Sequence, residues 1–480
     1  MSAVLVRSEV EAHGGDSAGC TIELSSVLPF GRLMLHAGTP RARGAAEILA
    51  GSVAMGTTTP PERSGTGAPP DPWDVLPHEE GPRDQRPHEH PDERLHLERA
   101  GARSAATVRL ALCGDVMLGR GIDQILPHPG DPTLRESHMR DARGYVELAE
   151  AANGPIPRPV GHDWPWGEAL PALTKAQPDA RILNLETSIT RSDRFASDKR
   201  VHYRMSPDNV GCLTAAEPDV CALANNHVLD LGRPGLEETL EVLASAGLPS
   251  AGAGRDRANA WEPAAVPLQG GGRVLVLSLG ATSSGIPPAW AATRRRPGVA
   301  LLADDPDANP GDDPDADAEA VLAHLARWRQ PGDHVVATIH WGANWGYAVP
   351  AMQVRLAHAL VDGGVDVVHG HSSHHPRPVE VHRGRPILYG CGDLINDYEG
   401  IGGREGYRSD LRVLFVIDLD RHTGALQALR MLPFQARRLR LHHASEADAA
   451  WLRDVLDRVS RPHGAGVSLA ADGALALEWT

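Results

Sequence analysis

The segment VDVVHGHSSHHPRPVEV, residues 365–381, places four histidines within seven residues at the end of an apolar run. They are His369, His371, His374 and His375. A buried imidazole needs a hydrogen-bond partner or a metal ion. A cluster that begins where a valine-rich strand ends therefore indicates several ring nitrogens that converge on one object.

Similar polar side chains follow other apolar runs of the chain. They are Asp115 after TVRLALC, Glu186 after ARILNL, Asn226 and His227 after DVCALA, and His340 after DHVVATI. This mixture of Asp, Glu, Asn and His, without a thiolate, favours Mn, Fe or Zn over a structural zinc site. About six ligands are too many for one tetrahedral ion and suit two bridged ions about 3.5–4 Å apart. Such a pair polarises a phosphoryl or acyl oxygen and generates hydroxide at neutral pH.

The elements that must position these side chains are short strands that alternate with helices. The strands are predicted to start at residues 107, 180, 219, 273, 333, 365, 385 and 411. RPGLEETLEVLASAG and AMQVRLAHALVDGG carry apolar residues at helical spacing. This alternation predicts an α/β sheet with covered faces, in which the carboxyl ends of the strands line one edge. The polar residues should meet there.

The remaining segments are predicted to be peripheral. Residues 1–105 are rich in Pro, Gly, charge and His and show no periodic apolar face, which predicts a disordered extension. Residues 303–319 predict an acidic loop that leads into a helix. The alternation of strands and helices defines a domain at residues 106–440. Residues 441–480 predict an amphipathic helix and a short β segment that are appended to the core of this domain.

Composition limits the possible partners and the compartment. The formal charge of −15, from 47 basic and 62 acidic residues, argues against nonspecific binding to nucleic acid or an anionic membrane. Five cysteines without a CxxC pair argue against a disulfide framework and favour a reducing compartment. No apolar run approaches a membrane span of about 18 residues, and the N-terminus does not match a signal peptide. We therefore expect a cytoplasmic protein.

Each candidate residue has a simpler explanation when it is taken alone. Asp115 could cap a helix or form a turn, Glu186 could belong to a buried ion pair, and His340 could be a core histidine. Arg120, within GRG, could approach an anion, although a plain turn also explains it. HExxH and the P-loop motif GxxxxGK[ST] are absent from the sequence, and GHSSHH fails GxSxG at its last position. The recurrence of ligand-type side chains after five strands favours a metal or polar active site.

Five motifs together resemble the CapA family, the poly-γ-glutamate capsule synthesis proteins. They are GDVMLGRGID, ILNLETSIT, ALANNHVLDLG, TIHWGANW and HGHSSHHPRPVEVHRGRPILYGCGDLINDY, and they span about residues 106–440. The resemblance implies a four-layer α-β-β-α sandwich similar to calcineurin-like metallophosphoesterases, and a hydrolase with two divalent ions. It implies metal-site roles for Asp115, Glu186, Asn226, His340, His371 and His374, with His227 beside the substrate. Asp230, three residues after His227, could orient its ring.

The chain departs from the family pattern in places that bear on function. Met117 stands where metallophosphoesterases have a histidine, and GHSSHH and YGCGDLINDY replace the more usual GHHPH and YSLGNF-like stretches. Three functions therefore remain open. They are a phosphoesterase-type hydrolase of an anionic small molecule or polymer, a non-catalytic accessory protein that binds a polyanionic polymer or a synthetase, and a metal-dependent γ-glutamyl amidase.

Overall fold

The computed structural model describes residues 20–22, 33–35, 106–197, 199–302 and 314–480. The chain divides into two compact units, Met1–Pro69 and Pro70–Thr480. In the first unit, β1 (Cys20–Ile22) pairs antiparallel with β2 (Leu33–Leu35). The rest of the extension predicted to be disordered, residues 1–105, lies outside the described residues.

The second unit contains a ten-stranded sheet. Its strands are β3 (Thr107–Val116), β4 (Ala180–Leu185), β7 (Val220–Ala222), β8 (Ser250–Ala251), β17 (Asp393–Ile395), β18 (Leu411–Asp420), β19 (Leu426–Ala436), β20 (Leu441–His443), β21 (Ala465–Leu469) and β22 (Leu475–Trp479). The order is β21-β22-β19-β18-β3-β4-β7-β8, with β17 beside β3 and β20 beside β19. The strands β3, β4, β7 and β8 are parallel, so their carboxyl ends share one edge.

A six-stranded sheet forms the second β layer. Its strands are β10 (Ala264–Pro267), β11 (Arg273–Gly280), β13 (His334–His340), β14 (Val367–His371), β15 (Val379–His382) and β16 (Arg385–Leu388), in the order β10-β11-β13-β14-β16-β15. The inner strands β11, β13, β14 and β16 are parallel, and the two edge strands run antiparallel to their neighbours. The inner strands read as near-continuous apolar runs because both faces of the sheet are covered.

Alternating side chains of the central strands build the core between the sheets. Val108, Leu110 and Leu112 of β3 belong to one buried cluster with apolar residues of β11, β13 and β14. Ala111 and Cys113, which point to the opposite face of β3, belong to a different cluster with the helices. The two sheets therefore pack face to face.

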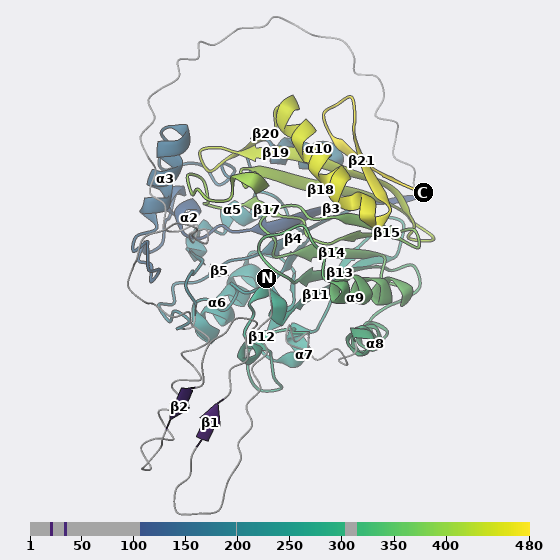
Figure 1. Ribbon diagram of the computed structural model, residues 1–480, viewed down its shortest axis with the longest axis horizontal. Coiled ribbons are helices and arrows are strands. Elements are labelled where there is room, and N and C mark those ends of the chain that lie inside the picture. Colours follow the sequence, from purple (N-terminus) through teal and green to yellow (C-terminus); the bar gives the residue numbers. More distant parts are fainter. Residues whose placement is uncertain (1–19, 23–32, 36–105, 198, 303–313) are drawn as a thin grey trace, which may run out of the picture. The chain divides into compact units, whose positions relative to one another are not determined.

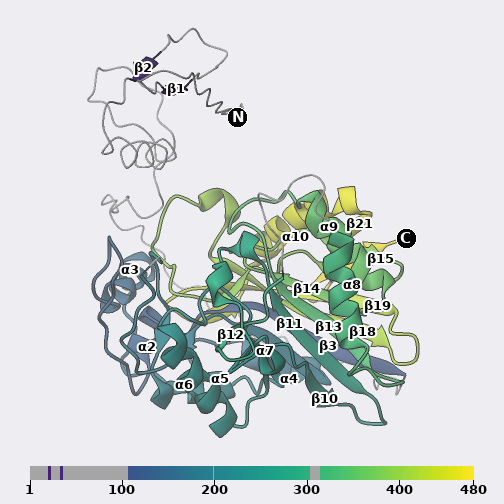
Figure 2. The same cartoon turned by 90° about the horizontal axis from the view of Figure 1, so that it is seen from below.

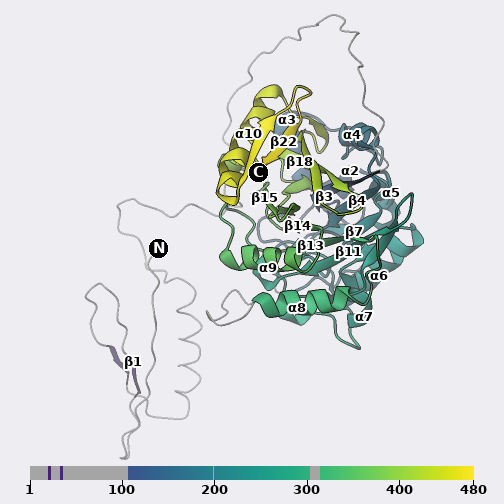
Figure 3. The same ribbon diagram turned by 90° about the vertical axis from the view of Figure 1, so that its right-hand side faces the viewer.

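Helices cover the outer faces of both sheets (Figure 1). The ten-stranded sheet is covered by α2 (Gly121–Ile125), α3 (Arg143–Asn153), α4 (Ala169–Ala176), α5 (Gly211–Thr214) and α6 (Gly232–Ser245), and the six-stranded sheet by α8 (Pro314–Leu325) and α9 (Ala351–Asp362). Figure 3 shows α8 and α9 together below β13 and β14. The yellow α10 (Glu446–Ser460) contributes Leu452 and Leu456 to the core between the sheets. The predicted four-layer α-β-β-α sandwich is confirmed.

The C-terminal segment differs from the predicted single β segment. α10 begins after Ser445, whose side chain accepts a hydrogen bond from the Asp448 backbone N–H. The following residues form two antiparallel strands, β21 and β22, and β22 pairs with β19. The turn between them contains Gly473 at φ +80°, and the Ala470 N–H donates to the Ala474 carbonyl at 2.8 Å. A single apolar run was predicted because this turn is only a few residues long.

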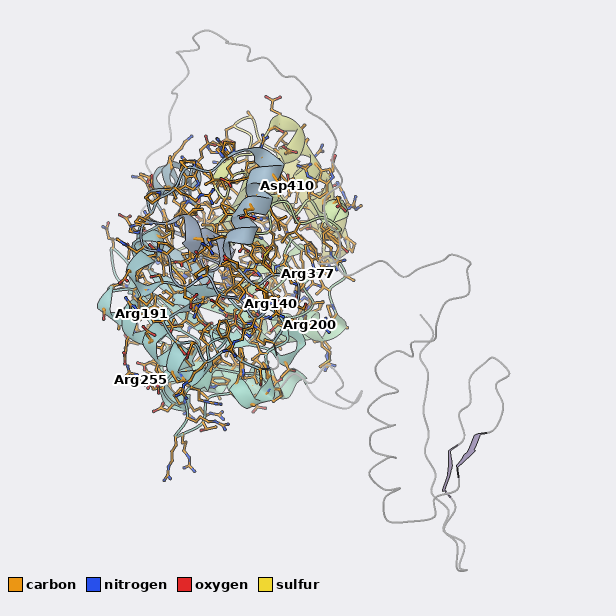
Figure 4. All side chains as sticks on the ribbon, turned by 90° about the vertical axis from the view of Figure 1, so that its left-hand side faces the viewer. Arg140, Arg191, Arg200, Arg255, Arg377 and Asp410 are labelled. Atoms are coloured by element: carbon orange, nitrogen blue, oxygen red, sulfur yellow. The ribbon has the colours of Figure 1, made fainter. Side chains whose placement is uncertain are left out.

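Charged side chains at the surface pair with one another. Arg191 and Arg255 are labelled in Figure 4, and they lie 2.7 and 2.9 Å from carboxylate oxygens of Asp208 and Glu241. Exposed pairs of this kind contribute little to stability. Among the described residues, no helix combines the length and apolar character that a membrane span requires.

Candidate metal centre

The carboxyl ends of strands from both sheets meet at one edge of the sandwich. In the ladders, Asp115 lies opposite Asn184, and His340 lies opposite His371. Of the predicted site residues, Asn226 is half-buried, and the others are buried, namely Asp115, Glu186, His227, Asp230, His340, His371 and His374. The structure thus brings together residues that are far apart in the chain, as the strand pattern predicted.

Asp115, His340 and His371 form the first group of possible metal ligands. Each offers one ligand atom, and these atoms lie within 4.8 Å of one another. The Nδ1 atoms of His340 and His371 are 2.7 Å apart, and His371 Nδ1 is 3.9 Å from Asp115 Oδ1. Burial lowers the pKa of both histidines well below the ordinary value. Two neutral rings in contact with each other beside a carboxylate form a donor set that suits a divalent cation.

Asp115, His374 and Asp393 form a second group that satisfies the same distance limit. His374 Nδ1 lies 2.9 Å from Asp393 Oδ1. Burial, together with the nearby Asp393 carboxylate, raises the pKa of Asp115 to about 7. Burial alone would lower the pKa of His374, but the Asp393 carboxylate raises it above the ordinary value. Asp115 therefore offers a carboxylate to both groups.

Asp393 was not among the residues predicted from the sequence. β17 pairs with β3 and places Asp393 opposite Asp115. The Asp115 N–H donates to the Gly392 carbonyl at 3.0 Å, and a Cβ on Gly114 would lie only 1.7 Å from that oxygen. Gly392 itself has φ +76°. The signal in the sequence was the repeated Gly-Asp dipeptide, since each glycine permits the close backbone approach that sets the two carboxylates side by side.

Glu186 and Asn226 surround the other side of the His340 ring. His340 Nε2 lies 3.1 Å from Asn226 Oδ1 and 3.7 Å from Glu186 Oε1. Burial raises the pKa of Glu186 well above its ordinary value, and the negative charge of Asp115 raises it further. Among the described atoms, Glu186 Oε2 is buried without a hydrogen-bond partner. A buried oxygen of this kind is costly unless a ligand satisfies it, so these residues fit divalent metal ions.

His227 lies beside these groups but belongs to neither of them. Its Nδ1 is 2.6 Å from Asp230 Oδ2, and its Nε2 is 3.7 Å from Glu186 Oε1. Lys199, which sequence reasoning missed, places Nζ 2.6 Å from Asp230 Oδ1 and 3.0 Å from His227 Nδ1. Burial lowers the pKa of His227 to about 4, although Asp230 opposes this shift. Lys199 follows no strand, so its position gave no signal in the sequence.

A cleft of about 150 Å³ opens onto these residues. Its lining includes Glu186, Asn226, His227, His340 and His374 from the site, and Trp345, Ser372, Tyr398 and Arg404 around them. The Arg404 guanidinium carbon lies 5.2 Å from the centre of the Trp345 ring. Ser372 has φ +97°, a strained conformation for a residue with a side chain, and its N–H donates to Asp115 Oδ2 at 3.2 Å. The cleft therefore joins carboxylates and imidazoles to a cationic, aromatic margin.

Several residues singled out in the sequence have other partners. His369 is buried outside both ligand groups, and His375 Nε2 accepts a hydrogen bond from the Gly346 N–H at 3.0 Å. Met117 is fully buried, with its sulfur 3.9 Å from the Tyr398 hydroxyl. The Arg120 guanidinium is buried and pairs with carboxylates of Asp397 and Glu136, and its pKa is raised well above the ordinary value because these charges outweigh the opposing effect of burial. Arg120 is thus a structural cation.

Comparison with known families gives a match to the part of the chain that contains these residues. The family model described as "Bacterial capsule synthesis protein PGA_cap" matches residues 109–398, which include both ligand groups. The chain belongs to this family. The PGA_cap match begins in β3 and ends just after β17, so it covers the strands that carry the candidate centre. The resemblance to the CapA proteins that the motifs indicated is confirmed.

Relatives of this PGA_cap protein carry names from polymer and capsule synthesis. A "Probable polyglutamine synthesis accessory protein" of Mycobacterium tuberculosis is 52% identical over 77% of this chain and 95% of its own length. The "PGA biosynthesis protein CapA" of Bacillus subtilis is 29% identical over 59% of this chain and 62% of its own length. A "Capsule biosynthesis protein CapA" of Bacillus anthracis is 24% identical over 60% of this chain and 59% of its own length.

Solved structures give a more distant likeness. A crystal structure described as a novel phosphatase of Mycoplasma pneumoniae covers 68% of this chain and 93% of its own chain, with 12% sequence identity and a TM-score of 0.36. A crystal structure of a Thermus thermophilus protein covers 67% of this chain and 97% of its own chain, with 10% identity and a TM-score of 0.29. Scores at this level support no inference about activity.

Proposed function

We propose that this PGA_cap protein is a metal-dependent hydrolase that acts on a phosphoester or related bond in polyglutamate or capsule synthesis. The observation that supports it most strongly is the shared carboxylate of Asp115, which belongs to two ligand groups at one cleft. A hydrogen-bonded imidazole, His227, lines the same cleft. The names of the relatives support the polymer or capsule context.

Two divalent ions, Mn, Fe or Zn, fit the donor set. One would be held by Asp115, His340 and His371, with Glu186 and Asn226 next to them, and the other by Asp115, His374 and Asp393. When bound, such ions polarise a phosphoryl or acyl oxygen and lower the pKa of water. Asp393, which lies opposite Asp115 in the ladder, would supply a carboxylate to the second ion in a chain that has Met117 in place of the family histidine.

The chain's own residues account for proton transfer. A carboxylate can only accept a hydrogen bond, so the Nδ1–H of His227 donates to Asp230. Nε2 is then the ring nitrogen that takes up and releases a proton. Nε2 accepts a proton from a reacting oxygen and returns it to the leaving group, while Asp230 stabilises the charged ring. Lys199 holds the Asp230 carboxylate from its other oxygen.

The margin of the cleft suits an anionic substrate. Arg404 is the cationic side chain of the lining, and Trp345 and Tyr398 provide aromatic surface beside it. A guanidinium binds phosphate or carboxylate oxygens through paired N–H donors. Both a phosphoester and a γ-glutamyl polymer carry such oxygens, so the margin fits either class of substrate.

A screen of the metallated full-length chain tests this proposal. The protein is loaded separately with Mn²⁺, Zn²⁺ and Fe²⁺, its metal content is measured, and phosphomonoesters, phosphodiesters and γ-glutamyl peptides are offered. We expect turnover of a phosphoester, abolished by His371→Ala. Turnover of γ-glutamyl peptides alone would identify an amidase instead. Full metal content without turnover, together with binding of poly-γ-glutamate, would establish the accessory protein that the name of the mycobacterial relative describes.

A further inference from the structure

A second cluster of metal-binding side chains lies outside the cleft. His358, Glu380 and His382 each offer one ligand atom, and these atoms lie within 4.8 Å of one another. His358 Nε2 is 2.7 Å from Glu380 Oε1. The rings of His358 and His382 stack with their centres 3.9 Å apart and their planes at 4°. The three groups are only partly exposed, with side-chain exposures of 32%, 11% and 22%.

The local structure explains why these side chains converge. Glu380 and His382 are two residues apart on β15, so they point to the same face of the strand. Val379 and Val381, which alternate with them along the strand, pack into the core between the sheets, and this directs the polar pair to the outer face. His358 lies on α9, the helix on that face, one turn before Asp362. Figure 2 shows α9 alongside β15.

The cluster lies at the opposite end of the six-stranded sheet from the candidate metal centre. His382 pairs with Arg385, the first residue of β16. β16 is parallel to β14, and β14 carries His371 at its carboxyl end. A helix that returns antiparallel to these strands brings its last turn, with His358 and Asp362, to their amino end. The cluster is therefore separate from the cleft and from the ligands assigned above.

Neighbouring side chains orient the Glu380 carboxylate and the His382 ring through hydrogen bonds. The Tyr389 hydroxyl donates to Glu380 Oε2 at 2.6 Å, so Oε1 is the oxygen directed at the histidine. Asp362 Oδ1 lies 2.8 Å from His382 Nε2 and 3.0 Å from Arg383 Nε. A carboxylate that holds the ring of a metal-binding histidine orients it and raises its basicity. Asp362 can fill this role, or it can become a fourth ligand after leaving Arg383.

We propose that His358, Glu380 and His382 bind one zinc ion, which is independent of the proposed hydrolytic centre. Two imidazoles and one carboxylate are a donor set that zinc accepts, with bond lengths of about 2.0–2.2 Å. Ligand atoms around such an ion are about 3.3 Å apart, so the His358–Glu380 contact must open by about half an ångström. The stacked rings of His358 and His382 must also turn relative to each other, because an imidazole binds a metal through a lone pair in its own ring plane. The ion would join α9 to β15, an edge strand of the sheet. Its role is to hold that edge in place.

Zinc titration of the full-length chain tests the site. Protein stripped with EDTA is titrated with Zn²⁺, and bound metal and melting temperature are measured for the wild type, His358→Ala and His382→Gln. His382→Gln retains a side chain that can donate to Asp362, which limits loss of folding. His422→Ala, an exposed histidine elsewhere, is the matched control. The same variants are also made in a His371→Ala background, in which the candidate metal centre lacks one of its ligands. Zinc binding that remains in this background then reports the site at His358, Glu380 and His382.

We expect the two cluster variants to bind one zinc equivalent fewer than the control, or to bind it at least tenfold more weakly. Zinc should still raise the melting temperature of the His371→Ala protein, because the second cluster remains intact in it. Adding His358→Ala or His382→Gln to this background should abolish that rise. Co²⁺ should give a tetrahedral visible spectrum in that background, and the cluster variants should remove it. Zinc stoichiometry and thermal response equal to those of His422→Ala would overturn the proposal, whether or not the cleft proves catalytic.

Discussion

Replacement of His227 by alanine tests the proposed chemistry directly. The ring contacts Asp230 through Nδ1 at 2.6 Å and faces Glu186 through Nε2 at 3.7 Å. Proton transfer by a positioned side chain contributes a factor of about 10² to 10⁴ to the rate. Each factor of ten corresponds to about 1.4 kcal/mol, so the barrier should rise by about 3–5 kcal/mol. We expect kcat to fall by about 10² to 10⁴.

The surroundings of His227 predict that the fold tolerates this change. Asp230 keeps the Lys199 ammonium at 2.6 Å and the Tyr203 N–H at 2.7 Å, so its carboxylate does not become an uncompensated buried charge. The loss of a buried hydrogen bond should lower the free energy of unfolding by about 1–3 kcal/mol. Because His227 belongs to neither ligand group, the metal content should equal that of the wild type.

His202→Ala provides the matched control. His202 is also buried, and its Nε2 lies 2.8 Å from the Ala196 carbonyl oxygen instead of lining the cleft. We expect this control to lose stability while it retains kcat per folded molecule. The assay compares kcat, metal content and melting temperature for both variants, with the substrate that the screen identifies. Unchanged activity per folded, metallated His227→Ala molecule would refute the catalytic role and favour an accessory protein.

Three further predictions concern the construction of the site and its surroundings. Asp115→Asn should remove both metal ions and Asp393→Asn only one, as measured by elemental analysis; equal losses would contradict a bridging Asp115. Gly114→Ala should lower both the melting temperature and the metal content, because its Cβ would meet a backbone carbonyl at 1.7 Å, and an unchanged melting curve would contradict this contact. Burial would raise the pKa of Asp410, but hydrogen bonds hold it at about 2, below the unfolded value of about 4. The ionised Asp410 carboxylate should contribute about 1 kcal/mol to the free energy of unfolding after solvent screening. This contribution should be present above pH 4 and disappear as the pH falls from 4 to 2. In acid unfolding, the stability of Asp410→Asn should therefore change less with pH over that range.

Most of the fold was predicted from the apolar runs of the sequence and from the residues at the ends of these runs. Each of the eight predicted strands corresponds to a strand of the structure, since buried parallel strands read as continuous apolar runs. The grouping of Asp115 with Glu186, and of His340 with His371, followed from one rule, that parallel strands end at a common edge. The two groups belong to different sheets, so their meeting also depends on how the sheets pack, which that rule does not predict.

Residues outside this pattern could not be located in the same way. Asp393 lies at the start of a three-residue strand, which is too short to give a periodic signal. Lys199 comes from a segment between strands, and only tertiary structure brings its ammonium to Asp230. Among the clustered histidines, His371 ends β14, whereas His374 and His375 lie in the loop that follows. His374 joins a ligand group while His375 packs beside Trp345, a difference that depends on side-chain direction in this loop.

The position of β3 has a consequence for synthesis on the ribosome. This strand supplies Asp115, yet its ladder partners include β17 and β18, which follow it by almost three hundred residues; the Arg109–Asp418 pair alone closes a separation of 309. A nascent chain that stops before β17 would hold an incomplete second ligand group and would leave one side of β3 without its ladder. Such a chain should stay open to chaperones and should lack the second proposed metal site. Completion of the second proposed metal site is therefore a late event, because it requires residue 393 to be synthesised.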